Sequence, residues 1–100
     1  MLLKELDNAD SEIRYEVAGA CGELEEETAV PYLINLINDH DIDVQLAAIN
    51  ALGKIGNIHA KECLDQCLND SSEAISQAAK QALFELELEE IPSSFQFGNN

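Results

Sequence analysis

Residues 31–56 read PYLINLINDHDIDVQLAAINALGKIG, and this stretch decides the fold. Apolar residues recur at helical spacing on both sides of an acidic turn, which predicts two helices, and Gly56 can end the second helix in a left-handed conformation. The apolar positions are Leu33, Leu36 and Ile37, then Val44, Ala48, Ala51, Leu52 and Ile55. A helix pair of this size cannot bury both apolar stripes alone, so it needs similar units as neighbours.

Such units lie on both sides of this stretch, at a fixed period of 31 residues. Asp41, the predicted N-cap of the second helix, corresponds to Asp10 in the preceding copy and to Ser72 in the following one. The second-helix apolar positions recur as Ile13, Val17, Cys21 and Leu24, and as Ile75, Ala79, Leu83 and Leu86. Three copies in phase predict an all-α, right-handed solenoid of three helix pairs, at about residues 1–28, 29–59 and 60–91.

The two ends of this array differ. Residues 92–100 are predicted to be a flexible tail, because Pro92 disfavours helix in the residue before it. The alternative is that Phe95 or Phe97 folds back over the third repeat and caps it. At the other end Thr28 is expected to cap the helix that contains Pro31. The N-terminal edge, with Leu2, Leu3 and Leu6, lacks a visible polar cap, so it is expected to associate with a partner or with further repeats.

The middle copy carries a motif that resembles a known family. Asp41 is followed three residues later by the β-branched Val44. The pattern Ala-x-x-x-Leu-Gly-x-Ile-Gly then begins at Ala48 and ends at Gly56. This pattern resembles the HEAT-like repeats named after phycocyanobilin lyases, over residues 2–88. The resemblance implies a scaffold that serves many functions, with the second helices lining a concave face. Of the arginines usual in this motif only Arg14 is present, and Phe84 replaces the glycine of the third copy.

Composition narrows the class of partner. The 100 residues are 46% hydrophobic, which suffices for one domain with a core, and the net charge is −15. Such a surface repels nucleic acids and anionic membranes, so a charged partner is expected to be basic. No stretch is long enough for a membrane span or a signal peptide. Three cysteines in a helical repeat protein suggest a reducing compartment, and we expect the cytoplasm.

No catalytic or metal-binding motif emerges from the sequence. His59, Cys63 and Cys67 have helical spacing, but Cys67 aligns with the core residue Leu36 and His59 is expected in a turn, so no metal site is predicted. The Asp-x-Asp-x-Asp run that begins at Asp39 lacks the glycine and glutamate of a calcium loop. The paired His-Glu motifs of di-iron hydroxylases with helical repeats are also missing. We therefore expect neither a cofactor nor catalysis.

The second helices present an apolar strip on the side opposite their predicted core. At about 100° per residue, Leu46 and Gly53 point away from that core, with Ile49 at the border. Their counterparts Tyr15 and Gly22 in the first copy, and Phe84 in the third, point the same way. Exposed apolar residues of this kind indicate a partner surface, unless neighbouring repeats half-cover them. The complete predicted partner-binding set is Tyr15, Leu46, Ile49, Asn50, Gln77, Gln81 and Phe84.

Two acidic runs follow the second helices of the first and third copies. They occupy helix ends where carboxylates oppose the helix dipole, and Lys54 stands at the intervening position. A charge run usually forms a solvated face, but two aligned runs could also form a rim for a basic partner. The predicted rim consists of Glu23, Glu25, Glu26 and Glu27, with Glu85, Glu87, Glu89 and Glu90.

These patterns together predict a non-catalytic scaffold or adaptor that binds a peptide or protein on the concave face. The family resemblance also allows an alternative, a subunit or fragment of a bilin lyase-like enzyme. No residue of the sequence indicates a tetrapyrrole pocket, and the chain is short for one.

Overall fold

The computed structural model describes the backbone of residues 2–90 and the side chains of residues 5–89. The predictions made for the tail, including the folding back of Phe95 or Phe97, lie outside these residues. In chain order the elements are η1 (Leu2–Asp7), α1 (Ser11–Glu23), η2 (Glu27–Ala29), α2 (Val30–Leu36), α3 (Ile42–Ile55), α4 (Ile58–Cys67) and α5 (Glu73–Glu90), where η marks a 3₁₀ helix.

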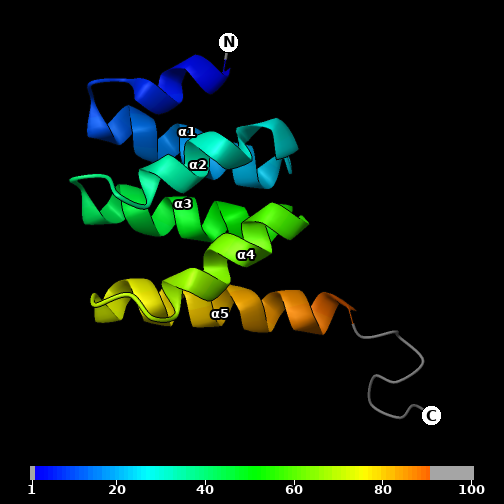
Figure 1. Ribbon diagram of the computed structural model, residues 1–100. Coiled ribbons are helices and arrows are strands. Elements are labelled where there is room, and N and C mark those ends of the chain that lie inside the picture. Colours follow the sequence, from blue (N-terminus) through cyan, green and yellow to red (C-terminus); the bar gives the residue numbers. More distant parts are fainter. Residues whose placement is uncertain (1, 91–100) are drawn as a thin grey trace.

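These elements form three stacked helix pairs (Figure 1). Helices α1, α3 and α5 lie side by side with the same direction, and α3 packs against both of the others. Helices α2 and α4 form a second layer, in which α2 packs against α3, and α4 packs against α3 and α5. Within residues 2–90 every regular element is helical. The predicted all-α solenoid of three repeats is therefore confirmed.

The second helices begin and end as their sequences predict. The carboxylates of Asp10 and Asp41 accept hydrogen bonds of 2.9 and 2.8 Å from the backbone amides of Glu12 and Asp43. The hydroxyl of Ser72 accepts a longer bond, 3.4 Å, from the amide of Ile75. Each bond pairs an amide that the first helical turn leaves without a partner. The expected N-caps are thus confirmed at all three copies.

The predicted left-handed conformation of Gly56 at the end of α3 is also confirmed, and the first repeat has the same conformation at a residue that is not glycine. Gly56 has φ +64°, and its counterpart Glu25, 31 residues earlier, has φ +51°. A left-handed conformation costs a residue with a Cβ atom about 1–2 kcal/mol, which glycine avoids. The first repeat therefore keeps the backbone geometry of the second without the residue that suits it.

The first helices depart from expectation in two places. Residues 2–7 form a 3₁₀ helix, because so short a segment gains few α-helical hydrogen bonds for its nucleation cost, although Leu6 is buried. Thr28 lies inside η2 and donates its hydroxyl to the Glu26 carboxylate at 2.7 Å, and no side chain caps α2, so the prediction of a Thr28 cap is wrong. The backbone amide of Val30 donates instead to the carbonyl oxygen of Glu27, and Pro31 has no amide hydrogen to be capped.

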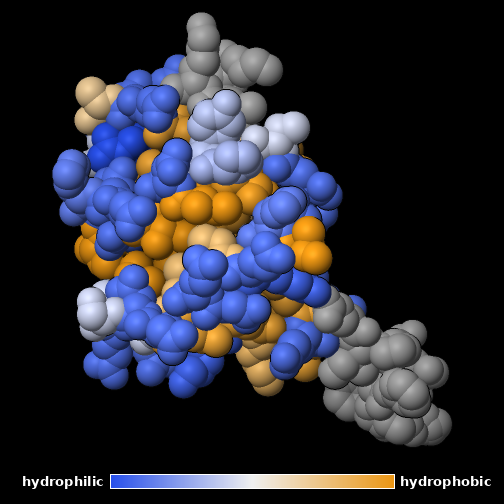
Figure 2. All heavy atoms as spheres, in the orientation of Figure 1, coloured by the Kyte–Doolittle hydropathy of each residue, from blue (hydrophilic) through white to orange (hydrophobic). Residues whose placement is uncertain are grey.

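The core runs through the stack between the two helix layers. Its fully buried side chains include Leu33, Leu52 and Leu64, one from each of three successive helices. Hydrophobic residues also reach the surface in a band across the middle of the molecule, with hydrophilic residues around it (Figure 2). No helix in residues 2–90 is long and apolar enough to cross a membrane.

Neighbouring repeats come into close contact at two glycines of the second helices. A Cβ atom at Gly22 would lie 2.8 Å from the Cα of Ala51, and one at Gly53 would lie 2.8 Å from the Cβ of Ala82. These glycines had been expected to point away from the core toward an open face. Instead they face the next helix of the row, so the prediction of their direction is wrong.

An ion pair joins the first repeat to the second. Arg14 of α1 donates to both carboxylate oxygens of Asp39, at 2.8 and 2.9 Å, and to the carbonyl oxygen of Asn8 at 2.7 Å. Gln45 and Ser76 occupy the position of Arg14 in the second and third repeats. Their side chains bond within their own repeats, to the carbonyl oxygens of Ile37 and Glu73. Only the first interface between repeats therefore carries this bidentate link.

Candidate partner-binding face

A continuous groove follows the row of second helices. It consists of three adjoining hollows, the first between the N-terminal ends of α1 and α3, the second between their middles, and the third between α3 and α5. The first two share Tyr15 and Asp43, and the last two share Leu46 and Asn50. We call this surface the α1–α3–α5 groove.

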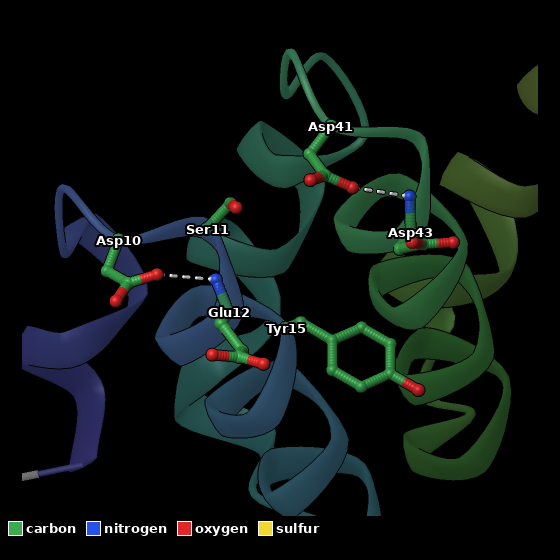
Figure 3. Close-up of a pocket in the computed structure, with 6 residues that line it drawn as sticks. All are labelled: Asp10, Ser11, Glu12, Tyr15, Asp41 and Asp43. Carbon is green, nitrogen blue, oxygen red and sulfur yellow. Dashed lines mark hydrogen bonds between the residues drawn. The ribbon is translucent and has the colours of Figure 1, made fainter.

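The first hollow is acidic. Its lining consists of Asp10, Ser11, Glu12, Tyr15, Asp41 and Asp43 (Figure 3). The N-caps of α1 and α3 lie next to each other because the two helices are parallel and in register. The Tyr15 ring projects from α1 toward α3, and its exposed fraction is 49%. This end of the groove thus combines an aromatic surface with carboxylates from two repeats.

The middle of the groove is apolar and open. The half-buried side chain of Leu46 lies between Tyr15 of the first repeat and the third repeat. Gly19 contributes to the floor, and a Cβ atom there would meet no atom within 4 Å. A partner's side chain can therefore approach the backbone of α1 at this point.

Charge in the groove is of one sign. The lining residues of the three hollows include six acidic side chains, Asp10, Glu12, Glu16, Asp41, Asp43 and Glu85. Among these lining residues, all within the described part of the chain, there is no lysine or arginine. Positively charged groups are therefore attracted to the groove, and anions are repelled.

The structure brings together five of the predicted partner-binding residues along the groove: Tyr15, Leu46, Ile49, Asn50 and Gln81. Gln81 donates a 2.9 Å hydrogen bond to Glu85. Gln77 is exposed but is not among the lining residues.

Ile49 requires a correction. It was placed at the border of the exposed strip, but its exposed fraction is 0%. It lies under the third hollow, where the side of α3 packs against Ala78 and Ala82 of α5. Side-by-side packing in the helix row buries this lateral position, so Ile49 supports the groove and is not available to a partner.

Phe84 requires a second correction. It occupies the position of Gly22 and Gly53, which face the next repeat, so it points to the outer end of the stack. Its neighbours there are Leu68 of α4 with Lys80 and Glu87 of α5, on a different surface from the groove. The strip of Tyr15, Leu46 and Phe84 is therefore not continuous.

The predicted acidic rim is also divided. Glu23 pairs with Lys54 of the next repeat, which holds the pKa of Glu23 below its usual value. Glu85 lines the groove, whereas Glu87 lies on the outer end with Phe84. Glu25 and Glu26 form the turn after α1 and Glu27 begins η2, so all three lie outside the groove lining.

Sequence reasoning missed the acidic end of the groove. Asp10 and Asp41 were interpreted as N-caps and Asp43 only as part of a rejected calcium-loop pattern, whereas Glu12 and Glu16 were not singled out. The 31-residue repeat contained the necessary signal, since Asp10 aligns with Asp41 and Glu12 with Asp43. Parallel second helices place aligned residues side by side, so matching acidic positions must meet.

The expectation that His59 lies in a turn is wrong. Helix α4 begins at Ile58, after the N-cap Asn57, so His59 lies on the same helix as Cys63 and Cys67. His59 is exposed and lies 3.9 Å from Glu62, whereas Cys67 is buried. Burial raises the pKa of the Cys67 thiol to about 11, which keeps it protonated at neutral pH. Among the described residues, no group of three or more His, Cys, Asp or Glu side chains is arranged to hold a metal ion.

A family model described as HEAT repeats matches residues 1–83. The chain belongs to the HEAT-repeat family. Its three helix pairs accordingly form a repeat scaffold. A search of curated proteins gave no match.

Two solved structures share this architecture. One is the complex of CpcE and CpcF of phycocyanin lyase from Nostoc sp., at 29% identity and a TM-score of 0.75, over 86% of this chain and 36% of the other. The second is human deoxyhypusine hydroxylase in complex with glycerol, at 24% identity and a TM-score of 0.78, over 99% and 33%. The protein described here therefore spans about a third of the length of each of these chains.

Proposed function

We propose that this chain is a non-catalytic scaffold whose α1–α3–α5 groove binds a basic segment of a partner protein. The observation that carries this proposal is that the charged side chains lining the groove are all acidic and surround an apolar centre. Leu46 and Tyr15 offer apolar surface, whose burial stabilises a complex by about 25 cal/mol per Å². The surrounding carboxylates select positive groups and reject acidic competitors.

The occupant that fits best alternates basic and apolar side chains. An extended segment places successive side chains on opposite sides, so its apolar residues can contact Leu46 while lysine or arginine reaches Glu16 and Asp43. Arginine can also stack on the Tyr15 ring. A partner in a cellular complex would present such a segment from a loop or a terminus.

The test is a titration of ¹⁵N-labelled protein with a synthetic peptide of alternating lysine and leucine. A peptide with glutamate in place of lysine is the matched control. We expect shift changes at Tyr15, Leu46 and Asn50 with the first peptide and none with the second. Leu46→Glu should abolish them, while Tyr32→Ser, which replaces an exposed tyrosine on α2, should leave them unchanged. Changes confined to the first helices, around Ile34, Asn35 and Asp65, would refute the location.

The similarity to the phycocyanin lyase complex favours a second candidate, a part of a bilin lyase-like enzyme. The groove would then hold the chromophore or its acceptor protein. Mixing the chain with a free bilin distinguishes the two, because a bound bilin changes its visible absorption band. A shifted band that Leu46→Glu removes would favour the lyase-like role over the scaffold.

A further inference from the structure

The carboxylates of the α1–α3–α5 groove are concentrated between the first and second repeats. Because the second helices are parallel and in register, residues 31 positions apart lie side by side across the row. Glu12 of α1 and Asp43 of α3 therefore line the same hollow, whereas the equivalent residue of α5 is Ala74. Glu16 has alanine at its equivalent positions in both later repeats. The pairing of acidic side chains thus ends at α3.

The third hollow, between α3 and α5, has a different chemistry. It is lined by the amide side chains of Asn50 and Gln81 and by apolar residues, and Glu85 is the one acidic residue of its described lining. Gln81 donates a hydrogen bond of 2.9 Å to Glu85, so this carboxylate has a partner within its own helix. The other acidic lining residues belong to α1, α3 or their N-caps. We call the two ends of the groove the acidic end and the amide end.

Apolar surface joins these two ends. The half-buried side chain of Leu46 lines both the second and the third hollow. Gly19 leaves the backbone of α1 open in the second hollow, while Asn50 and Gln81 occupy the equivalent positions of α3 and α5. Across the row the groove therefore presents carboxylates beside the Tyr15 ring, then an apolar centre, then side-chain amides (Figure 3 shows the acidic end).

A segment must cross the row to contact all three chemistries. Packed helices lie about 8–10 Å apart, so the axes of three adjacent helices span roughly 16–20 Å. An extended segment covers this distance with about six residues, at roughly 3.3 Å per residue. A segment laid along the α1–α3 boundary would reach the carboxylates and Leu46, but it would leave Gln81 of α5 without a contact.

We infer that the partner segment crosses the row of second helices, with its basic residues over α1 and α3 and its uncharged polar residues over α5. This inference rests on the proposed function of the groove, and it adds the order of the partner's side chains. Lysine or arginine occupies the polar positions of one half of the segment, and glutamine, asparagine or serine those of the other half. A lysine over the third repeat would lie beside Ala74 and Ala78 and gain no comparable ion pair.

Two peptides of identical composition test this order. The first is Lys-Leu-Lys-Leu-Gln-Leu-Gln, made in both chain directions, and the control is Lys-Leu-Gln-Leu-Gln-Leu-Lys. One lysine moves from the basic half to the opposite end, which removes one exposed ion pair with the acidic end. The better direction of the first peptide should therefore bind roughly two- to fivefold more tightly than the control. Titration of the ¹⁵N-labelled protein measures both affinities.

A nitroxide attached to the peptide through an amide bond reports its placement, because it broadens the signals of nearby backbone amides. At the uncharged end of the first peptide, the nitroxide should broaden Ala78 and Gln81 of α5 more strongly than Glu12 and Glu16 of α1. At the basic end it should have the opposite effect. Each measurement is the control for the other, since the peptide and the protein are otherwise unchanged.

A variant that transfers charge across the row tests the cause of this placement. It combines four substitutions at exposed positions, Glu12→Ala, Glu16→Gln, Ala74→Glu and Gln77→Glu, and so keeps the net charge of the chain. Circular dichroism should show that its helices are kept. The nitroxide at the uncharged end should then broaden α1 more strongly than α5. Glu62→Gln with Gln66→Glu, which exchanges the same side chains between exposed positions of α4, should leave the broadening unchanged.

The outcomes separate this inference from the proposed function on which it rests. If neither peptide binds, the groove is not a site for basic segments and both statements fail. If both peptides bind equally well, or the nitroxide broadens α1 and α5 alike from either end, the order is wrong although the groove binds. A placement that stays the same in the charge-transfer variant would also overturn the order, because carboxylates would then not determine it.

Discussion

At the scale of single residues, the spacing between repeats depends on where glycine stands. Gly19, Gly22 and Gly53 all lie in helices, yet only the last two touch a neighbouring helix. The sequence shows the repetition of Gly22 and Gly53, but helical periodicity alone assigned both to an open face. It cannot separate a side that faces solvent from a side that faces the next repeat, and Ile49 was misplaced for the same reason.

Matched substitutions at two of these glycines test this distinction. Gly22→Ala places a Cβ atom 2.8 Å from the Ala51 backbone and should destabilise the fold by roughly 1–3 kcal/mol. Gly19→Ala meets open space and should stabilise it by about 0.5–1 kcal/mol, because alanine favours helix. Urea unfolding of the two variants measures both changes. Equal effects of one sign would show that Gly22 is not a contact between repeats.

The Arg14–Asp39 ion pair makes a prediction about pH. Arg14 holds the pKa of Asp39 below its usual value through a bidentate hydrogen bond. The pair therefore stabilises the fold fully above the unfolded pKa of about 4 and loses this contribution as pH falls through the lower folded value.

Asp39→Asn should cost about 1–3 kcal/mol at pH 7 and progressively less as the pH is lowered below 4. Thermal melting as a function of pH measures this difference. As a control, Asp7→Asn alters an exposed carboxylate and should leave the pH profile close to that of wild type. A constant difference between Asp39→Asn and wild type at every pH would show that the ion pair does not contribute.

At the scale of whole elements, local signals predicted the second helices well and the first helices less well. Asp10, Asp41 and Gly56 act through hydrogen bonds or backbone angles within a few residues of themselves, so the sequence contains their effect. Thr28 failed as a cap because it lies inside a 3₁₀ turn, where the carbonyl of Glu27 competes for the amide of Val30. Short connecting turns are decided by such competition, which hydrophobic periodicity does not register.

The end of α1 offers a test of element termination. Glu25 adopts φ +51° where the second repeat has Gly56 at φ +64°. Glu25→Gly should therefore stabilise the fold by about 1 kcal/mol, since glycine takes this conformation without strain. Calorimetry should show a melting temperature higher by about 4–8 °C for each kcal/mol. A gain of the same size for Glu27→Gly, outside the left-handed position, would mean that charge relief and not backbone geometry is responsible.

At the scale of the whole molecule, stacking creates a surface that no single repeat contains. The groove draws Tyr15 from the first repeat, Leu46 from the second and Gln81 from the third. Periodicity predicted that Tyr15 and Leu46 share a face, since each repeat presents the same side. It could not predict that Phe84 leaves this face, because this position faces the next second helix in the first two repeats and lies with Leu68 and Glu87 in the third.

The stack places one group of carboxylates inside the groove and another outside it, so their effects on binding can be compared. Glu12, Glu16 and Asp43 line the groove, whereas the three glutamates at residues 25–27 lie outside it. Neutralising either group with glutamine or asparagine removes three negative charges. The Debye length falls from about 10 Å at 0.1 M salt to about 3 Å at 1 M, so only close charges act at high salt.

Association of the lysine–leucine peptide should therefore slow more in the groove variant than in the variant of residues 25–27, and the difference should be greatest near 0.1 M salt. Leu46→Glu should mainly speed dissociation at every salt concentration, because it removes apolar contact from the centre of the groove. Stopped-flow fluorescence with a labelled peptide measures both rates. Equal slowing by the two triple variants would mean that net charge alone attracts the peptide, and the groove would lose its assignment as the site that selects basic partners.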